Sequence, residues 1–392
     1  MSSPDLGAAE IAAVQQVLAT HHLSLGPRLD AFERALAEYV GAAYGVGVNA
    51  GTSGLHLCVI AAGVGPGDLV ITTPFSFVAS ANCILYERAI PVFVDVDPAS
   101  GNIDPEIAAA AADDLMSGRS AARRWLPPAL RDSAPIATAL KAVLPVHVFG
   151  QPADMDPIVA MARRHNLAVI EDACEAIGAE YKGSRVGGSA DAAVFAFYPN
   201  KQMTTGEGGI IVTHSEARVG LLRSLRNQGR DVFDGGLAHV RLGYNYRLDE
   251  MSAALGLAQL QRLDQMLAQR ARVAGWYDER LADLEPIERP TVVESTTRMS
   301  WFVYVVRIKA PYRREEVVRR LAAAGIPSRP YFTPIHLQPF YRQQFGYRRS
   351  AFPVAEYLGD VSLALPFSSV MAESQVDRVC DVLRSILGDN AC

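Results

Sequence analysis

Short apolar runs alternate with helical patterns of apolar and polar positions between about residues 45 and 215. Near-continuous apolar strands separated by helices are typical of a mostly parallel sheet that is covered by helices on both faces. We expect seven strands in this sheet, within the stretches YGVGVNAG, DLVITTP, PVFVDVD, AVLPVHVFG, LAVIEDA, AAVFAFYP and GGIIVTH. In such sheets ligands bind beyond the carboxyl ends of strands, so residues that follow a strand are candidates for a functional site.

The rest of the chain departs from this rhythm in two places. Residues 107–139 are rich in Ala, Arg and Pro, and we interpret them as a helix and a surface insertion before the next strand. From about residue 255 a long helical pattern leads to an apolar strand, another helix and a loop-rich stretch. We therefore expect an α/β protein with a large domain over residues 1–255 and a smaller α+β domain over residues 256–392.

Composition narrows the class of protein. The chain has 392 residues, 49% of them hydrophobic, which is enough for one large core or two linked ones. Its formal net charge is −5 and its pI is about 5.9. Because it lacks the excess of Lys and Arg that neutralises phosphates, we expect no nucleic-acid partner.

Cysteine usage and the N-terminal residues bear on location. The five cysteines are scattered and form no CxxC pair, so we expect free thiols rather than disulfides or a metal site. The first residues lack the basic and apolar regions of a signal peptide. No stretch reaches the roughly 18 uninterrupted apolar residues that span a membrane. These features predict a soluble, cytoplasmic protein without a membrane segment.

Lys201 occupies an unusual place, directly after the apolar run FAFYPN and before a turn rich in Thr and Gly. An amine that is withdrawn from water favours its neutral form, which attacks carbonyl groups and forms Schiff bases. The alternative is a lysine whose stem packs while its ammonium group reaches solvent. Lys201 is therefore a candidate nucleophile.

Asp172 ends the predicted strand LAVIEDA, where strand ends meet the ligand crevice. A buried carboxylate requires a cationic partner. The protonated pyridine nitrogen of pyridoxal phosphate (PLP) is such a partner, and the pairing keeps this cofactor an electron sink. The alternative role for Asp172 is a cap of the following helix.

Two further strand exits carry matching chemistry. Residues 49–55 (NAGTSGL) lead from a strand into a helix start whose free N–H groups can bind phosphate, and the small Thr52 and Ser53 belong to this turn. Phe75 and Phe77 follow another strand, and an aromatic ring there can stack on a flat cofactor, although a core position is the commoner case. A phosphate-binding turn, an aromatic, a carboxylate and a lysine are together what PLP chemistry requires. We expect this cofactor and no metal.

Longer stretches carry a resemblance to a known family. EDACEAIGAEYKGSRVG and FAFYPNKQMTTGEGG resemble the DegT/DnrJ/EryC1/StrS family of sugar aminotransferases, which are PLP enzymes of fold type I, the aspartate aminotransferase class. The similarity covers nearly the whole chain and includes LSLGPRLDAFERALAEYVG, GTSGLHL, TTPFSFVASANCILYERAIPVFVDVD, PVHVFGQPADMDPI, RLGYNYRLDEMSAALGLAQL and RPYFTPIHLQPFY.

The resemblance implies roles for matching residues. Lys201 matches the lysine that carries the cofactor and moves a proton, Asp172 matches the carboxylate that faces the pyridine nitrogen, and Phe77 matches the ring that stacks on the cofactor. Thr52 and Ser53 match the turn that holds the phosphate.

Two more matches lie further along the chain. Asn245 matches an asparagine that reaches the phosphate from the neighbouring subunit, which implies a homodimer with shared active sites. His336 matches a histidine near the cofactor and the substrate.

This sequence departs from the family pattern at two positions. Ala196 stands where many members have a serine that contacts the phosphate, so that hydrogen bond is either missing or supplied by another group, such as Gln202 or a water. Glu175 stands where Gln or His is common, and we expect it near the cofactor or the sugar, with a structural partner for a nearby cation as the alternative. Glu here resembles the GDP-perosamine synthase branch, which aminates C4. The loop at residues 226–241 is expected to help select the nucleotide.

The resemblance implies an aminotransferase that moves an amino group from L-glutamate to a nucleotide-linked keto-6-deoxyhexose, with C4 favoured over C3. A cyclitol (inosose) aminotransferase and a non-catalytic regulator with the same fold are the alternatives. Intact Asp172 and Lys201 argue against the regulator. Lys201 also argues against a sugar dehydratase of the same family, because that branch has a histidine in its place.

Overall fold

The computed structural model describes residues 3–132, 139–230 and 238–388. A seven-stranded sheet in the order β1–β9–β8–β5–β4–β2–β3 forms the centre of the large body. Its strands are β1 (Tyr44–Val48), β2 (Leu69–Thr72), β3 (Ile90–Phe93), β4 (Leu140–Leu144), β5 (Ala168–Asp172), β8 (Ala192–Ala196) and β9 (Gly209–Thr213). β9 runs antiparallel to its neighbours β1 and β8, whereas the other neighbouring pairs are parallel. The predicted α/β fold with a mostly parallel seven-stranded sheet is confirmed.

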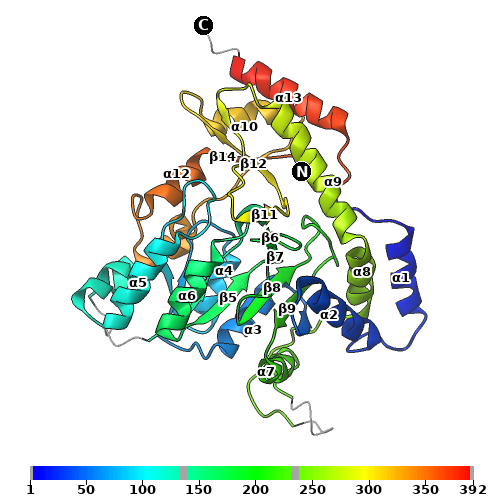
Figure 1. Cartoon of the computed structure of the whole chain (residues 1–392), viewed down its shortest axis with the longest axis vertical. Helices are drawn as coiled ribbons and strands as arrows, with labels where there is room; N and C mark the ends of the chain where they lie inside the picture. The colour runs from blue at the N-terminus through cyan, green and yellow to red at the C-terminus, as the bar shows by residue number, and fades with distance from the viewer. Residues whose placement is uncertain (1–2, 133–138, 231–237, 389–392) are drawn as a thin grey trace.

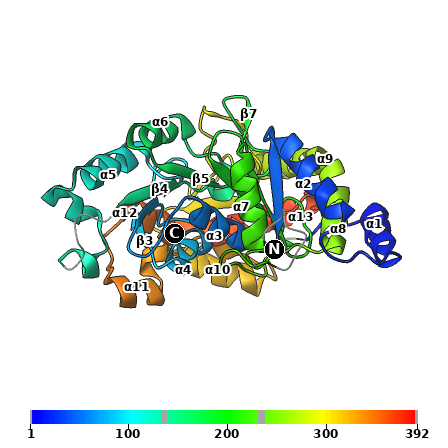
Figure 2. The same cartoon turned by 90° about the horizontal axis from the view of Figure 1, so that it is seen from below.

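Helices cover both faces of this sheet (Figure 1 and Figure 2). They are α3 (Gly51–Ala61), α4 (Ala79–Tyr86) and α7 (Glu216–Arg226) on one face, and α2 (Pro27–Val40), α5 (Pro105–Ser117), α6 (Met155–His165) and α8 (Glu250–Gln261) on the other. On β8, Val194 packs on the face that α3, α4 and α7 cover, whereas its neighbours Ala193 and Phe195 pack on the opposite face. Because both faces are buried, the strands are apolar at nearly every position.

A second sheet of four strands, in the order β10–β12–β14–β13, forms the centre of the C-terminal part. Its strands and helices are β10 (Ile287–Glu288), β12 (Tyr304–Ile308), β13 (Arg329–Pro330), β14 (Ser362–Leu365), α9 (Leu263–Arg280), α10 (Arg314–Ala323) and α13 (Glu373–Gly388). Their apolar side chains form a separate core cluster that includes Tyr277, Tyr304 and Leu383. The division at residue 255 falls within α8 and stays a prediction.

The long helical pattern from residue 255 is interrupted in the structure. α8 ends at Gln261 and α9 begins at Leu263, and Arg262 between them has a φ of −119°. The Arg262 guanidinium group binds the carboxylates of Glu10 and Asp5, each at 2.7 Å. The residue at the break is thus held by the N-terminal segment, which no local pattern reveals.

The remaining elements surround the two sheets. They are α1 (Ala8–Leu18), α11 (Pro339–Phe345), α12 (Pro353–Val361), the three-stranded sheet of β6 (Glu180–Tyr181), β7 (Ser184–Arg185) and β11 (Thr296–Arg298), and the 3-10 helices η1 (Ser120–Trp125), η2 (Pro128–Leu130), η3 (Val148–Gly150) and η4 (Ile335–Leu337). Of the insertion at residues 107–139, residues 133–138 lie outside the described residues. Ala122 and Leu126 of this insertion are buried in the core cluster of α5 and α6.

Within the described ranges, no helix is long and apolar enough to cross a membrane, and no group of three or more His, Cys, Asp or Glu residues could hold a metal ion. The described cysteines, Cys58, Cys83, Cys174 and Cys380, are free thiols. Cys392 lies outside the described residues, and the cytoplasmic location stays a prediction.

Candidate active site

A cavity of about 570 Å³ lies beyond the carboxyl ends of β1, β5 and β8. Five of the predicted site residues line it: Thr52, Phe77, Asp172, Glu175 and Lys201. Because the carboxyl ends of parallel strands share one edge of a sheet, residues far apart in the sequence meet here.

Strand alternation separates the two adjacent acids at the end of β5. Asp172 lines the cavity and is 7% exposed, and its Oδ1 accepts the Cys174 N–H at 3.1 Å. Burial raises the pKa of Asp172, which a cationic partner would oppose. Glu171 is not among the cavity residues, because successive side chains of a strand point to opposite faces.

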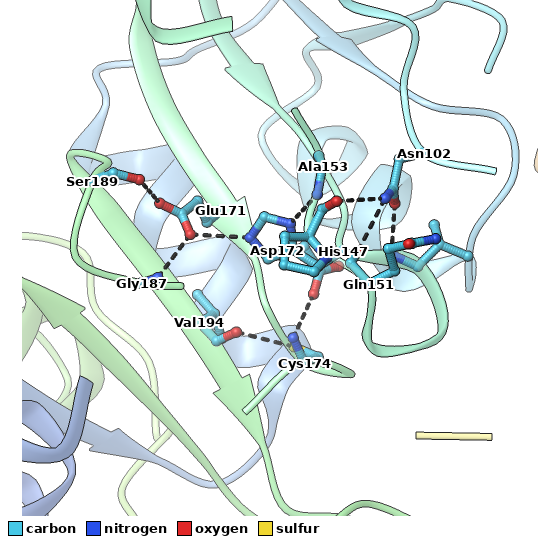
Figure 3. Close-up of polar contacts among 12 residues, drawn as sticks. Asn102, His147, Gln151, Ala153, Glu171, Asp172, Cys174, Gly187, Ser189 and Val194 are labelled. Atoms are coloured by element: carbon cyan, nitrogen blue, oxygen red, sulfur yellow. Dashed lines mark hydrogen bonds and ion pairs between the residues drawn. The ribbon is translucent and has the colours of Figure 1, made fainter. Parts of the chain in front are cut away.

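Glu171 belongs to a buried network that fixes the end of β5 (Figure 3). Its carboxylate accepts hydrogen bonds from His147 Nε2 at 3.0 Å, from the Gly187 N–H and from the Ser189 hydroxyl. His147 Nδ1 accepts the Ala153 N–H at 3.0 Å, so Nε2 carries the proton. Although burial opposes it, these donors lower the pKa of Glu171. The backbone N–H of His147 donates to the carbonyl oxygen of Asp172 at 3.0 Å, and this bond connects the network to the cavity.

Lys201 directs its amine into the cavity rather than to open solvent. Its side chain is 13% exposed, and Nζ lies 3.4 Å from Glu175 Oε1. Nζ also lies 4.0 Å from the centre of the Phe302 ring, where a cation is attracted to the π face. The alternative of a solvent-seeking ammonium group does not describe this arrangement.

Glu175 is the counterpart of that amine. Its other oxygen, Oε2, accepts the Phe149 N–H at 3.0 Å. Burial raises the pKa of Glu175, and the charge of Lys201 opposes this shift. Glu175 is therefore the partner of a nearby cation, and that cation is the candidate nucleophile. A place near the cofactor or the sugar stays a prediction.

The start of α3 offers N–H groups to one end of the cavity. Its N-cap, Ala50, provides no side-chain hydrogen bond, and Gly51 and Thr52 line the cavity. An uncapped helix start of this kind attracts phosphate. A Cβ atom on Gly51 would lie 2.7 Å from the Cβ of Ala196, so this close turn requires glycine. Ser53 is not brought to the cavity, since its hydroxyl donates to Asn49 Oδ1 at 2.7 Å.

The two candidate phenylalanines have different environments. Phe77 lines the cavity and is 62% exposed, whereas Phe75 is 1% exposed and packs in the core. Phe77 is thus the ring that is available to a ligand. It also borders an adjoining open groove of about 810 Å³.

Three other residues that were expected at the site do not line the cavity. Asn245 is exposed and is not a lining residue, as its proposed action in a second subunit requires. His336 is fully buried, and its Nε2 lies 3.0 Å from Glu356 Oε1, so the structure does not bring it to the cavity. Gln202 Nε2 donates to the Glu175 carbonyl and the Ser300 hydroxyl, so it does not replace the serine missing at Ala196.

Sequence reasoning missed several lining residues. Tyr198, Asn200 and Glu207 flank Lys201 along the chain, and their proximity to it was a usable signal. Phe302 and Tyr331 come from the C-terminal third. Tyr331 belongs to the family-like stretch RPYFTPIHLQPFY, in which His336 was singled out instead, whereas no motif included Phe302. In the loop at residues 226–241, residues 231–237 lie outside the described residues.

The lining groups fit PLP. They supply an amine for its aldehyde, a buried carboxylate for its pyridine nitrogen, backbone N–H groups for its phosphate and an available aromatic ring. An open α/β sheet with these groups beyond its strand ends defines a fold-type I PLP-dependent enzyme.

Comparisons with known proteins agree with this class. The profile of the DegT/DnrJ/EryC1/StrS aminotransferase family matches residues 4–384. The chain is 40% identical to GDP-perosamine synthase of Caulobacter vibrioides over 93% of this chain and 91% of that protein. It is 35% identical to the spore coat polysaccharide biosynthesis protein SpsC of Bacillus subtilis, over 98% and 96%. The solved structure of DesV of S. venezuelae covers 97% of this chain and 94% of its own, with 33% identity and a TM-score of 0.85. The chain belongs to the DegT/DnrJ/EryC1/StrS family and is a PLP-dependent aminotransferase.

The buried His336 predicts a pH dependence of stability. Burial lowers the pKa of His336 below its ordinary 6.5. The unfolded chain therefore takes up a proton first as the pH falls, and the folded state loses stability below pH 6.5. At a pH below both the folded-state and the unfolded-state pKa of His336, the loss reaches about 1.4 kcal/mol for each pH unit that separates these two values.

His336→Gln tests this dependence, because its amide can still donate to Glu356 but does not titrate. Chemical unfolding at pH 7.5 and pH 5.5 should show a smaller loss of stability in the variant than in the wild type. Equal losses in both proteins would show that His336 does not contribute.

Proposed function

We propose that this aminotransferase moves the amino group of L-glutamate to a nucleotide-linked keto-6-deoxyhexose, at C4 rather than C3. The observation that carries the catalytic part is the meeting of Lys201 and Asp172 in one cavity with the uncapped start of α3. The acceptor is supported by the 40% identity to GDP-perosamine synthase. A glutamate at position 175, as in the GDP-perosamine synthase branch, supports amination at C4.

The cofactor supplies the electron sink that stabilises a carbanion at the reacting carbon. Asp172 would pair with the protonated pyridine nitrogen, and its burial would strengthen that interaction. Thr52 and the N–H groups at the start of α3 would hold the phosphate, and Phe77 would be available to stack on the cofactor.

Lys201 is the base and the acid of the proposed reaction. In each half-reaction its Nζ accepts a proton from one carbon and passes it to another, beginning at the donor carbon in the first and ending at the acceptor carbon in the second. Glu175, 3.4 Å from Nζ, stabilises the ammonium form between these transfers. The ring of Phe302 faces the same amine and keeps water from that side.

The proposed homodimer shares its active sites through Asn245. Tyr244 and Tyr246 on either side of it stack with ring centres 5.0 Å apart, and both pack against His56. These contacts hold the segment to α3 and leave Asn245 exposed, where a second copy can receive it.

A panel of acceptors tests the reaction. L-glutamate alone should remove the visible band of the bound cofactor, and a nucleotide-linked 4-keto-6-deoxyhexose should restore it with an amine at C4 by NMR. Lys201→Ala should bind PLP weakly and lose at least about 1,000-fold in turnover, because proton transfer and covalent attachment are both removed. Transfer to a keto-cyclitol but to no nucleotide sugar would favour the cyclitol alternative. Near wild-type turnover by Lys201→Ala would refute the assignment.

Subunit mixing tests the shared site. A Lys201→Ala subunit and an Asn245→Ala subunit together form one intact site only if Asn245 acts across the dimer. Mixed dimers should therefore regain a large part of one wild-type site, whereas each variant alone stays weak. No gain on mixing would mean that Asn245 acts within its own subunit or not at all.

A further inference from the structure

Arg270 of α9 is one of the largest fully buried side chains and is 2% exposed. Among the described residues no carboxylate forms an ion pair with it, and burial lowers its pKa to about 10. A guanidinium group without a counter-ion is costly in a protein interior, so its partners show what it is retained for.

Its hydrogen-bond partners are three backbone carbonyls, two of which belong to the cavity-lining residues Lys201 and Phe302. Nη2 donates to the carbonyl of Lys201 at 3.0 Å. Nη1 donates to the carbonyls of Trp301 and Phe302 at 3.1 Å and 3.2 Å. The planar fork of arginine can hold such separated acceptors at once, which the single ammonium group of lysine cannot.

The backbone at Trp301 is shaped for this contact. Consecutive carbonyls of an extended strand point to opposite sides, yet those of Trp301 and Phe302 bind the same nitrogen. Trp301 has a φ of 51°, in the left-handed region that non-glycine residues rarely adopt. The Phe302 N–H is held in turn by the Phe149 carbonyl at 3.2 Å.

These contacts form a closed circuit of interactions that includes the Lys201 amine. Lys201 Nζ meets Glu175 Oε1, and Glu175 Oε2 accepts the Phe149 N–H. The Phe149 carbonyl binds the Phe302 N–H, and Arg270 joins the carbonyls of Phe302 and Lys201. The centre of the Phe302 aromatic ring lies 4.0 Å from Nζ.

We propose that Arg270 is a positioning residue that sets the place of the Lys201 amine between Glu175 and the Phe302 ring. It acts through the backbone and connects α9, which continues into the C-terminal part, to the reacting group (Figure 1). The inference rests on the proposed role of Lys201.

The test compares Arg270→Met and Arg270→Lys with Val273→Ala. Methionine removes the charge and the donors, whereas lysine keeps the charge without the fork. Val273 lies nearly one turn further along α9, is 1% exposed and packs in the C-terminal core, so its truncation is the matched control for lost packing. Thermal unfolding confirms that each variant is folded at the assay temperature. If Arg270→Met does not fold, Arg270→Lys decides.

The first measurement is the half-reaction with the amino donor in the holoenzyme. We expect its limiting rate to fall about 100-fold in Arg270→Met and about 10-fold in Arg270→Lys, with the donor KM changed less than about threefold, because misplacement by about 1 Å has effects of this size. Val273→Ala should stay within about twofold of the wild type.

The second measurement needs neither donor nor acceptor, so it separates this inference from the proposed substrates. Cofactor-free protein is treated with trace acetic anhydride, and acetylation of Lys201 is compared with that of exposed Lys309 by peptide mass spectrometry. The ratio should rise several-fold in both Arg270 variants, because the amine leaves its protected place, and should not change in Val273→Ala. Arg270 variants with a wild-type rate and ratio but lower stability would overturn the proposal and leave Arg270 a structural residue.

Discussion

The active site depends on keeping an amine and two carboxylates away from water at fixed positions. Lys201, Asp172 and Glu175 line one cavity and are largely withdrawn from solvent. Burial raises the pKa of both carboxylates, because their charged forms lose contact with water. Charged groups in such a place interact strongly, but each must be compensated and held. Much of the surrounding structure performs this task.

The fold meets the constraint with two layers of support. Beneath the cavity, the His147–Glu171 network fixes the end of β5, so Asp172 is presented from a rigid strand. At the side, segments of the C-terminal part bring Phe302 and the Arg270 fork to Lys201. The proposed active site therefore takes its charged groups from the ends of one sheet, and both parts of the chain hold these groups in place.

The sequence predicted features that are local. Seven strands were recognisable because both faces of the sheet are buried, and Asp172 and Lys201 stood out because polar residues directly follow apolar strands. Features made by distant contacts were not predictable in this way. Arg262 interrupts the expected long helix next to Asp5 and Glu10, more than 240 residues away. Phe302 and Arg270 reach the amine only through tertiary packing. Ser53 was assigned from the small residues of its turn and His336 by family likeness, and the structure engages both with other residues, Asn49 and Glu356.

The central claim is that Lys201 carries the cofactor, and covalent mapping tests it most directly. The sequence contains four lysines, Lys141, Lys182, Lys201 and Lys309, so the assignment is unambiguous. Borohydride reduction of the PLP-loaded enzyme, followed by peptide mass spectrometry, should place the pyridoxyl group on Lys201 alone. A pyridoxyl group on another lysine, or none on an enzyme that retains PLP, would contradict the account.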